Sequence, residues 1–259
     1  MDDAPASLPP EHEVPVRVRG LTMAFGDRLI QRDLDFDIRQ SEVLAIAGRS
    51  GCGKSTLLRH LIGLQAPAAG SVCYGEQSIH TDDEAIQAHL RRRFGVAFQS
   101  GALWSSMTVG ENVMLPMEMF SDASAAEREQ RAREKLTLVG LGEQFAAEPA
   151  SLSGGMRKRA AIARALALEP QLIYLDEPSA GLDPITSAEL DDLIRRLRDE
   201  QGATVVMVSH ELDSIFQVAD RLLFLDAEEK TMTALDAPRA LLEHGPESVR
   251  AFLRRGRAA

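Results

Sequence analysis

The fold is decided by residues 151–183, SLSGGMRKRAAIARALALEPQLIYLDEPSAGLD. The first part predicts a helix, because Ser153 is a good N-cap for the Ala/Leu-rich run that follows it. Gly154 and Gly155 leave backbone N–H groups uncovered, and a helix start of this kind attracts anions. The apolar run at 172–175 then predicts a buried parallel strand.

Two acids, Asp176 and Glu177, follow this strand directly. A carboxylate pair at the carboxyl end of a buried strand suits a Mg²⁺ ligand, here Asp176, beside a general base, here Glu177. The alternative interpretation is an ordinary core strand followed by a solvated acidic turn. We favour the functional interpretation, because such a pair after a core strand is costly without a role.

A glycine-rich turn, GRSGCGKST at 48–56, follows the apolar run at 43–47. It fits GxxxxGK[ST], the P-loop, between a predicted strand and a predicted helix. The glycines let backbone N–H groups surround phosphate oxygens, Lys54 adds positive charge near the β- and γ-phosphates, and Ser55 offers a hydroxyl to Mg²⁺. An ordinary βα turn would not need this complete spacing. The residues predicted to contact nucleotide here are Gly48, Ser50, Gly51, Gly53, Lys54, Ser55 and Thr56.

Polar side chains also follow two other apolar runs. Gln99 comes after 94–98, and His210 comes two residues after 203–208. Because the carboxyl ends of parallel strands meet at one crevice, we expect these side chains to join the P-loop and the acid pair. The set predicts nucleoside-triphosphate hydrolysis. Glu177 would deprotonate the attacking water, His210 would contact the γ-phosphate, and Gln99 would be a further Mg²⁺ ligand.

Composition narrows the classes of protein. The chain has 259 residues, of which 44% are hydrophobic and 26% are charged, as in ordinary globular proteins. The net charge of −10 argues against broad nucleic-acid binding. No apolar run approaches the length of a membrane-spanning helix. Residues 1–13 are acidic and proline-rich and predict a flexible arm without signal-peptide features, so the expected location is the cytoplasm. Cys52 and Cys73 are expected to be free thiols.

Other segments give weaker signals. Alternation predicts strands over 14–19 and 33–38, and Phe25 lies in the turn between them, where it could stack on a nucleotide base or belong to the core edge. Residues 221–225 predict the final strand, and 236–255 predict two short helices. Residues 100–148 are helical in pattern and rich in methionine. These methionines, with Trp104, suit a partner surface or a small helical core, and we favour the partner surface.

Taken in order, the P-loop, Gln99, LSGGM, LDEP, SAGLD and VSH resemble an ABC-type ATPase domain over about residues 14–252. The resemblance implies an α/β P-loop NTPase fold with a mostly parallel core sheet flanked by helices, an N-terminal antiparallel β part and an inserted helical subdomain. It implies a single ABC ATPase domain over 14–259. The expected boundaries are a RecA-like core at about 14–100 and 160–235, a helical subdomain at about 101–159 and a helical tail at about 236–259.

In that family the domain works as a head-to-tail homodimer with ATP and Mg²⁺ at the interface. The resemblance therefore implies that Ser153, Gly154 and Gly155 serve the partner's nucleotide. It also implies that Asp183 lies at the dimer seam and that Phe25 stacks on the base. Phe25 replaces the commoner tyrosine, and Met156 stands where many members have glutamine. Neither difference threatens hydrolysis.

A narrower resemblance is carried by FQSGALW at 98–104, TVGENV at 108–113, LSGGMRKRAAIARALALEP at 152–170, GLDPIT at 181–186 and PESVRAFLRRG at 246–256. These segments are similar to the ATPase subunit of Mla/MCE-type systems, which move phospholipids or other lipids between membranes. The resemblance implies a membrane permease that docks near residues 99–120, a small regulatory subunit and an MCE-domain lipid-binding protein. It places the chain on the cytoplasmic face of the inner membrane.

Three other functions stay open at this point. An ABC importer motor for a small polar solute, such as an amino acid, shares every catalytic motif, and only residues 98–113 argue against it. A soluble ABC ATPase acting outside transport would normally carry coiled coils, zinc modules or a second ATPase domain. A dimerisation switch with negligible turnover is disfavoured by the intact Glu177 and His210.

Overall fold

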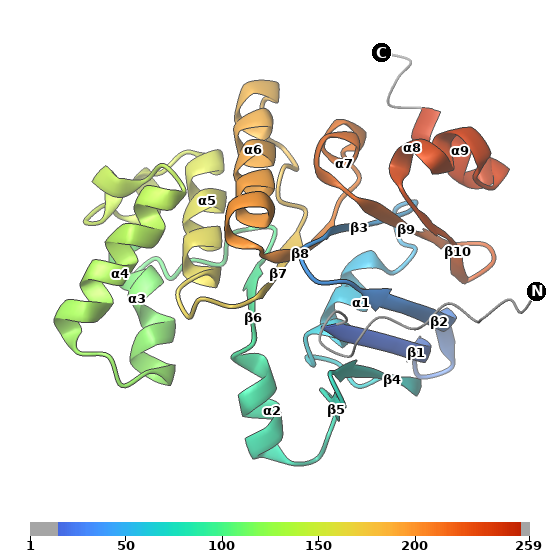
Figure 1. The fold of residues 1–259 in the computed structure, drawn as a ribbon, viewed down its shortest axis with the longest axis horizontal. Coiled ribbons are helices and arrows are strands. Elements are labelled where there is room, and N and C mark those ends of the chain that lie inside the picture. Colours follow the sequence, from blue (N-terminus) through green and yellow to red (C-terminus); the bar gives the residue numbers. More distant parts are fainter. Residues whose placement is uncertain (1–14, 255–259) are drawn as a thin grey trace, which may run out of the picture.

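The computed structural model describes residues 15–254 and contains two sheets with helices packed around them (Figure 1). The smaller sheet is antiparallel along its whole width, and alternate residues of its long strands are buried, as expected when one face covers a core. Its strands, in spatial order, are β2 (Arg28–Ile38), β1 (Val16–Phe25), β4 (Ala69–Tyr74) and β5 (Gln77–Ser78).

The larger sheet positions the site. Its strands, in spatial order, are β10 (Thr231–Asp236), β9 (Arg221–Asp226), β3 (Val43–Ala47), β8 (Thr204–Val208), β7 (Leu172–Asp176) and β6 (Phe94–Ala97). All neighbours from β9 to β6 are parallel, and β10 alone is antiparallel. Because four of the parallel strands end next to one another, the predicted convergence of the P-loop, Gln99, the acid pair and His210 at one edge has its structural basis.

The helices of the described residues are α1 (Lys54–Leu61), α2 (Glu84–Arg91), α3 (Val109–Phe120), α4 (Ala125–Leu138), α5 (Gly154–Ala165), α6 (Pro184–Gln201), α7 (Leu212–Val218), α8 (Pro238–His244) and α9 (Glu247–Arg254). Helices α3, α4 and α5 stand together at one end of the molecule (Figure 1). Thr108 and Ser124 begin α3 and α4 with complete capping boxes. A helical subdomain bounded at about 101–159 stays a prediction.

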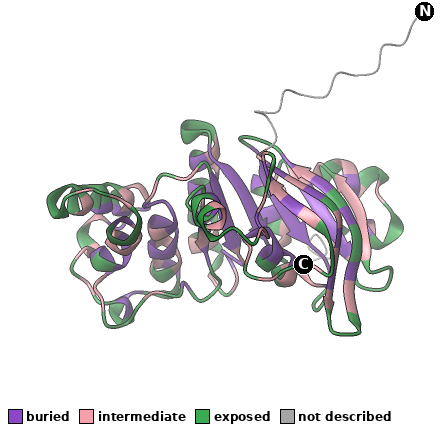
Figure 2. Cartoon of the chain, turned by 90° about the horizontal axis from the view of Figure 1, so that it is seen from below, coloured by how far each residue is buried: buried purple, intermediate pink, exposed green. Residues whose placement is uncertain are grey.

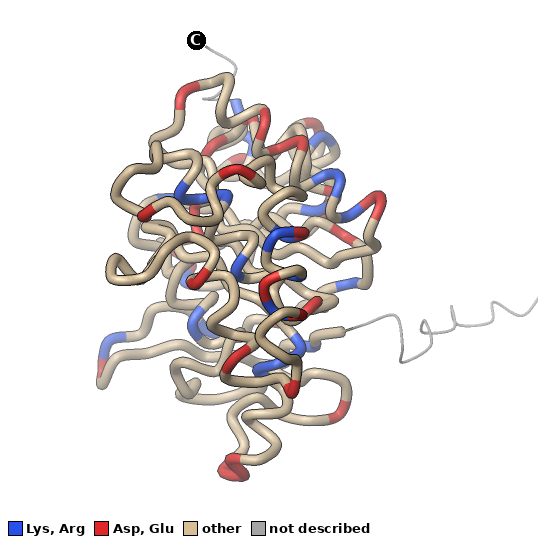
Figure 3. The backbone as a smooth tube through the Cα atoms, turned by 90° about the vertical axis from the view of Figure 1, so that its left-hand side faces the viewer, with Lys and Arg blue, Asp and Glu red and all other residues tan. Residues whose placement is uncertain are grey.

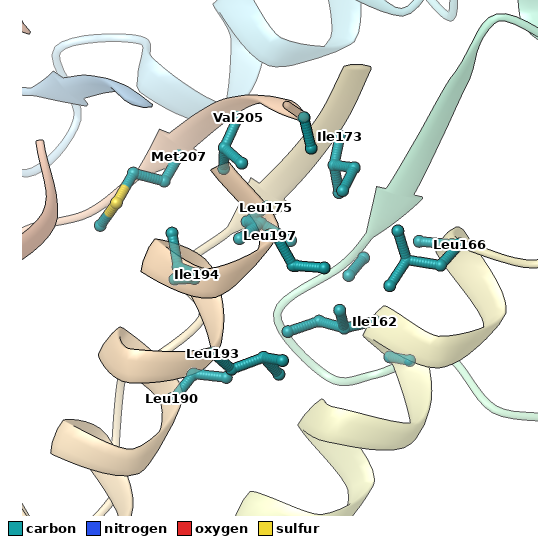
Figure 4. Close-up of a cluster of buried hydrophobic side chains, with 14 of the residues drawn as sticks. Ile162, Leu166, Ile173, Leu175, Leu190, Leu193, Ile194, Leu197, Val205 and Met207 are labelled. Carbon is teal, nitrogen blue, oxygen red and sulfur yellow. The ribbon is translucent and has the colours of Figure 1, made fainter. Parts of the chain in front are cut away.

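The core lies on both faces of the larger sheet. Alternate residues of β3 show this directly: Val43 and Ala45 belong to one buried cluster, and Leu44 and Ile46 belong to the other. Figure 4 shows the first cluster, where side chains of α5 and α6 meet those of β7 and β8. Figure 2 shows that the buried residues concentrate in the strands, while exposed residues cover the outer helices and loops. Positive and negative residues are interspersed along the chain (Figure 3).

The fold class predicted from the sequence is confirmed, with one correction. Residues 221–225 were expected to form the final strand, but β10 follows β9 as an antiparallel edge strand. Its residues, TMTALD, do not form a continuous apolar run like those of the parallel strands, and none of them is fully buried. The two helices of the predicted tail are present as α8 and α9. The predicted arm at 1–13 lies outside the described residues.

One buried carboxyl group lies between α6 and α7. Asp191 is only 5% exposed, and its Oδ2 accepts a hydrogen bond from Ser214 Oγ at 3.0 Å. Its Oδ1 has no hydrogen-bond partner among the described residues. Burial raises the pKa of Asp191 from 3.8 to about 6, although the hydrogen bond from Ser214 and the nearby Arg195 oppose the shift.

This raised pKa predicts a pH dependence of stability. The folded chain binds the Asp191 proton more tightly than the unfolded chain, so this contribution to the free energy of unfolding is lost as the pH rises through about 6. Asp191→Asn should therefore raise the melting temperature relative to the parent more at pH 8 than at pH 5. The matched control is Glu200→Gln, which changes an exposed carboxyl group on the same helix. The same difference in melting temperature between Asp191→Asn and the parent at pH 5 and at pH 8 would contradict the prediction.

Candidate active site

The loop between β3 and α1 has a backbone that requires glycine. A Cβ on Gly48 would lie 2.4 Å from the carbonyl oxygen of Leu225, which leaves no room for a side chain. Gly53 has φ +104° at the N-cap of α1, and a Cβ there would lie 2.7 Å from Cγ2 of Ile30. Lys54 Nζ donates to the carbonyl of Gly48 at 3.1 Å, so its ammonium lies over the loop. The P-loop prediction therefore matches the local geometry.

The buried amide of Gln31 supports the P-loop by a hydrogen bond to its backbone. Gln31 in β2 is fully buried, and its Nε2 donates to the carbonyls of Cys52 at 2.8 Å and Asp226 at 2.9 Å. It therefore ties the smaller sheet to the P-loop and to the end of β9. The sequence analysis missed Gln31, because a single glutamine in a strand carries no motif. Its only sequence signal is an amide on the inward face of β2.

The predicted magnesium ligands meet at the end of β7. Ser55 Oγ donates to Asp176 Oδ1 at 3.3 Å. Burial raises the pKa of Asp176, and the nearby Glu177 charge adds to the increase. A hydroxyl and a carboxylate oxygen at this spacing fit Mg²⁺, which keeps several waters and is also bound by substrate phosphates. Among the described residues there is no group of three or more His, Cys, Asp or Glu residues arranged to hold a metal. Bound there, Mg²⁺ would neutralise charge on the phosphates.

The predicted base and the predicted histidine contact each other. Glu177 Oε2 lies 2.7 Å from His210 Nδ1, because β7 and β8 are adjacent and parallel. The Glu177 side chain is largely buried, whereas His210 is exposed. The histidine Nε2 also lies 3.4 Å from Glu211 Oε1. A carboxylate held in this way can accept a proton from water, and the imidazole fixes its direction.

A cavity of about 700 Å³ opens over these groups. It is lined by Gly48, Arg49, Ser50, Lys54, Glu177, His210, Glu211, Leu212, Asp213 and Phe252. The structure therefore brings the P-loop, the predicted base and the predicted histidine to one cavity. Phe252 of α9 was not predicted at the site. Its ring makes a T-shaped contact with the ring of Phe224, with 5.1 Å between the centroids, and this contact anchors α9 beside the cavity.

Other predicted residues lie outside the lining of this cavity. Phe25 is 49% exposed at the turn between β1 and β2, and Gln99 is exposed after β6. Ser153 caps α5 by accepting from the backbone N–H of Met156 at 3.2 Å, and Gly154 follows it on the surface. Gly155 is buried and packs closely against Thr186. A Cβ on Gly155 would lie 2.4 Å from Thr186 Cγ2, so a side chain does not fit there.

Asp183 has a clear role within its own chain. It caps α6 by accepting hydrogen bonds from the backbone N–H groups of Ile185 and Thr186 and from the Thr186 hydroxyl. These bonds lower the pKa of Asp183, the hydroxyl contributing most. The side chain is exposed, so its predicted position at a dimer seam stays a prediction.

A strand that leads into a phosphate-binding loop, in the same parallel sheet as a strand that ends on a carboxylate base, defines a P-loop nucleoside triphosphatase. The chain belongs to the ABC transporter family, whose model matches residues 31–180. ATPases of this family use ATP with Mg²⁺.

Known proteins resemble this chain along most of its length. It is 39% identical over 241 residues to the probable ribonucleotide transport ATP-binding protein mkl of Mycobacterium leprae, an alignment that covers 93% of this chain and 69% of the relative. It is 42% identical over 212 residues to the methionine import ATP-binding protein MetN of Mesorhizobium japonicum, which covers 82% of this chain and 58% of the relative. The alignments therefore span 69% of the first relative and 58% of the second.

Solved structures give the same fold. A dimeric ATP-binding cassette in a post-hydrolysis state with ADP and Pi superposes with a TM-score of 0.77 and 32% identity, covering 86% of this chain and 98% of that one. The cbiO1 protein of Clostridium perfringens, part of the ABC transporter complex cbiONQ, superposes with a TM-score of 0.81 and 26% identity. That superposition covers 94% of this chain and 95% of cbiO1.

Proposed function

We propose that this chain is the ATP-hydrolysing motor of a membrane ABC transport complex that moves phospholipids or other lipids between membranes. The observation that carries the transport part is an exposed apolar surface near the end of β6 and along α3. In the described part of the chain, four of the seven exposed large apolar side chains fall within residues 98–120, namely Phe98, Trp104, Met119 and Phe120. Such a concentration is typical of a protein–protein contact.

The loop that carries Trp104 is organised before any partner binds. Asn112 is fully buried, and its Oδ1 accepts from the backbone N–H of Trp104 at 2.7 Å. Its Nδ2 donates to the carbonyls of Trp104, Met107 and Thr108. One amide therefore closes the whole turn, while the Trp104 side chain stays 59% exposed. A rigid loop with an exposed indole suits the docking of a permease helix, since little ordering entropy is lost on binding.

The hydrolysis step follows from the site. Water attacks the γ-phosphorus in line, a bond forms from the water oxygen to phosphorus, and the bond from phosphorus to the β,γ-bridging oxygen breaks. Glu177 accepts the water proton, and His210 holds the carboxylate in the direction of the cavity. Lys54 and the P-loop N–H groups bind the phosphates and stabilise the charge that develops on them.

The lipid cargo rests on the resemblance of residues 98–113 and 246–256 to Mla/MCE-type ATPases. The names of the relatives favour other cargoes. MetN is a methionine import protein, and mkl is a probable ribonucleotide transport protein. An importer motor for a small polar solute such as an amino acid is therefore the second candidate. A soluble ATPase outside transport is the third, and the exposed surface at 98–120 disfavours it.

The proposal includes the assembly. Two copies would pair head to tail with ATP at the interface, and a permease would dock near residues 99–120. A small regulatory subunit and an MCE-domain lipid-binding protein would complete the complex on the cytoplasmic face of the inner membrane. Within residues 15–254 no helix is long and apolar enough to cross a bilayer. No nucleic-acid partner is proposed, because the chain carries a net charge of −10.

A pull-down from detergent-solubilised membranes of the native host tests the proposal. The retained proteins are identified by mass spectrometry, together with any lipid that co-purifies. Recovery of a multi-spanning permease, an MCE-domain protein and phospholipid would support lipid transport. A permease with a solute-binding protein and no lipid would favour the importer. Recovery of no membrane protein would contradict the transport function and leave only the ATPase.

A further inference from the structure

Glu177 has a backbone conformation that it would not adopt by itself. Its φ is +50°, in the left-handed region that non-glycine residues rarely occupy. Pro178 follows it, and a residue before proline normally prefers an extended conformation. A strained residue of this kind persists only where its surroundings hold it in place. The groups that hold the Glu177 backbone therefore determine where its carboxylate points.

Both backbone polar groups of Glu177 are tied to other elements. Its N–H donates to the carbonyl of Val208 at 2.9 Å, which fixes the residue to β8. Its carbonyl accepts from Lys158 Nζ at 3.0 Å, and Lys158 lies on α5. The same ammonium donates to the carbonyl of Ala180 at 2.6 Å, and the backbone N–H of Ala180 donates to the Glu177 carbonyl at 3.4 Å, so Lys158 and the backbone together hold the turn that follows the base. Lys158 is the side chain that fixes this turn from the side of α5.

We propose that Lys158 is a positioning residue for hydrolysis, which holds the Glu177 backbone in its strained conformation and so aims the carboxylate at the attacking water. The ammonium is half-buried, and both of these hydrogen bonds go to neutral carbonyls. Burial lowers the pKa of Lys158, while the charges of Glu177 and Glu211 oppose the decrease. Removing the Lys158 ammonium from water to donate two carbonyl hydrogen bonds costs free energy, which a purely structural turn would not require. The cost is reasonable if these bonds fix the position of a catalytic base.

The position of Lys158 on α5 extends the proposal. Ser153 and Gly154, at the start of the same helix, are the residues proposed to meet the partner's nucleotide. Lys158 lies about one turn further along, so α5 joins that contact to the base of its own chain. Binding of the partner's nucleotide to the start of α5 would therefore affect the position of Glu177, which serves the nucleotide site of its own chain. This inference rests on the proposed function, because it takes Glu177 as the base.

Steady-state hydrolysis by the full chain, assembled with the permease that the pull-down recovers, tests the inference. Lys158→Met should lower kcat by about tenfold or more, because a small misplacement of a catalytic group is costly. The KM and Kd for ATP should change by less than about twofold, because the P-loop contacts are untouched. Lys158→Arg should recover part of the lost kcat, since its guanidinium can still donate to both carbonyls.

The matched control is Lys135→Met. Lys135 is also a poorly exposed helical lysine, and its Nζ contacts Glu169 Oε1 at 2.8 Å, away from the site. Its kcat should equal that of the parent. An unchanged kcat in Lys158→Met, or an equal loss of kcat and ATP affinity without rescue by arginine, would overturn the positioning role. Glu177→Gln in the same assay separates the two proposals, because a fully active Glu177→Gln would contradict the proposed base itself.

Discussion

Glu177→Gln should reduce steady-state ATP hydrolysis by about 10²- to 10⁴-fold, the contribution typical of a positioned general base. The amide is isosteric with the carboxylate and can keep a hydrogen bond to His210, which lies 2.7 Å from Glu177 Oε2. It cannot accept the proton of the attacking water. ATP affinity should be retained, because the P-loop and Lys54 are unchanged. The variant should therefore accumulate ATP-bound protein that does not turn over.

Two measurements on Glu177→Gln check this prediction, namely phosphate release and binding of a fluorescent ATP analogue. Glu200→Gln is the matched control, because Glu200 is exposed near the C-terminal end of α6, away from the strand ends that carry the site. It should hydrolyse ATP at the parent rate. Turnover by Glu177→Gln close to the parent rate would show that another group accepts the proton. Loss of both turnover and binding would indicate a folding defect instead.

The sequence predicted the parts of the site that depend on local pattern. The P-loop, the acid pair and His210 each follow a short apolar run, and parallel strands place such positions at one edge without further information. The fold class could be predicted for the same reason. The contact between Glu177 and His210 was not predicted, because only the structure shows that β7 and β8 are neighbours in the sheet.

The supporting residues could not be predicted, because their roles depend on contacts between distant segments. Gln31 reaches a carbonyl 195 residues away, and no spacing rule connects Gln31 with Asp226. In the sequence, Lys158 is one of several basic residues on a predicted helix. Only the structure shows that its ammonium contacts the carbonyls of Glu177 and Ala180. Phe252 lines the cavity only because α8 packs against β10 and α9 packs against β9 through Phe224. Edge strand β10 was missed because its residues, TMTALD, do not form a continuous apolar run.

Two inactive variants should restore activity when they are mixed, and this would establish the head-to-tail dimer. Lys54→Met removes the P-loop ammonium, and Gly154→Asp puts a negative charge at the start of α5, where the partner's phosphates are proposed to lie. The fold should tolerate Gly154→Asp, because the nearest atom to a Cβ there is 3.9 Å away and an acid suits a helix N-terminus. Each variant alone should lose at least about 100-fold in rate, the size of effect found when a transition-state contact is removed.

Mixing the variants changes which chain supplies each half of a site. Lys54 lines the cavity of its own chain together with Glu177, whereas Gly154 is not among the residues that line it. If Gly154 serves the partner's nucleotide, a mixed dimer contains one site in which both motifs are defective and one in which both are intact. Random pairing makes half of the dimers mixed, so the mixture should regain up to about a quarter of the parent rate. The readout is phosphate release from the mixture and from each variant alone, with differently tagged copies to count the mixed dimers. Mixed dimers that form with ATP yet stay inactive would contradict a site shared between two chains, because each chain would then need its own Lys54 and its own Gly154.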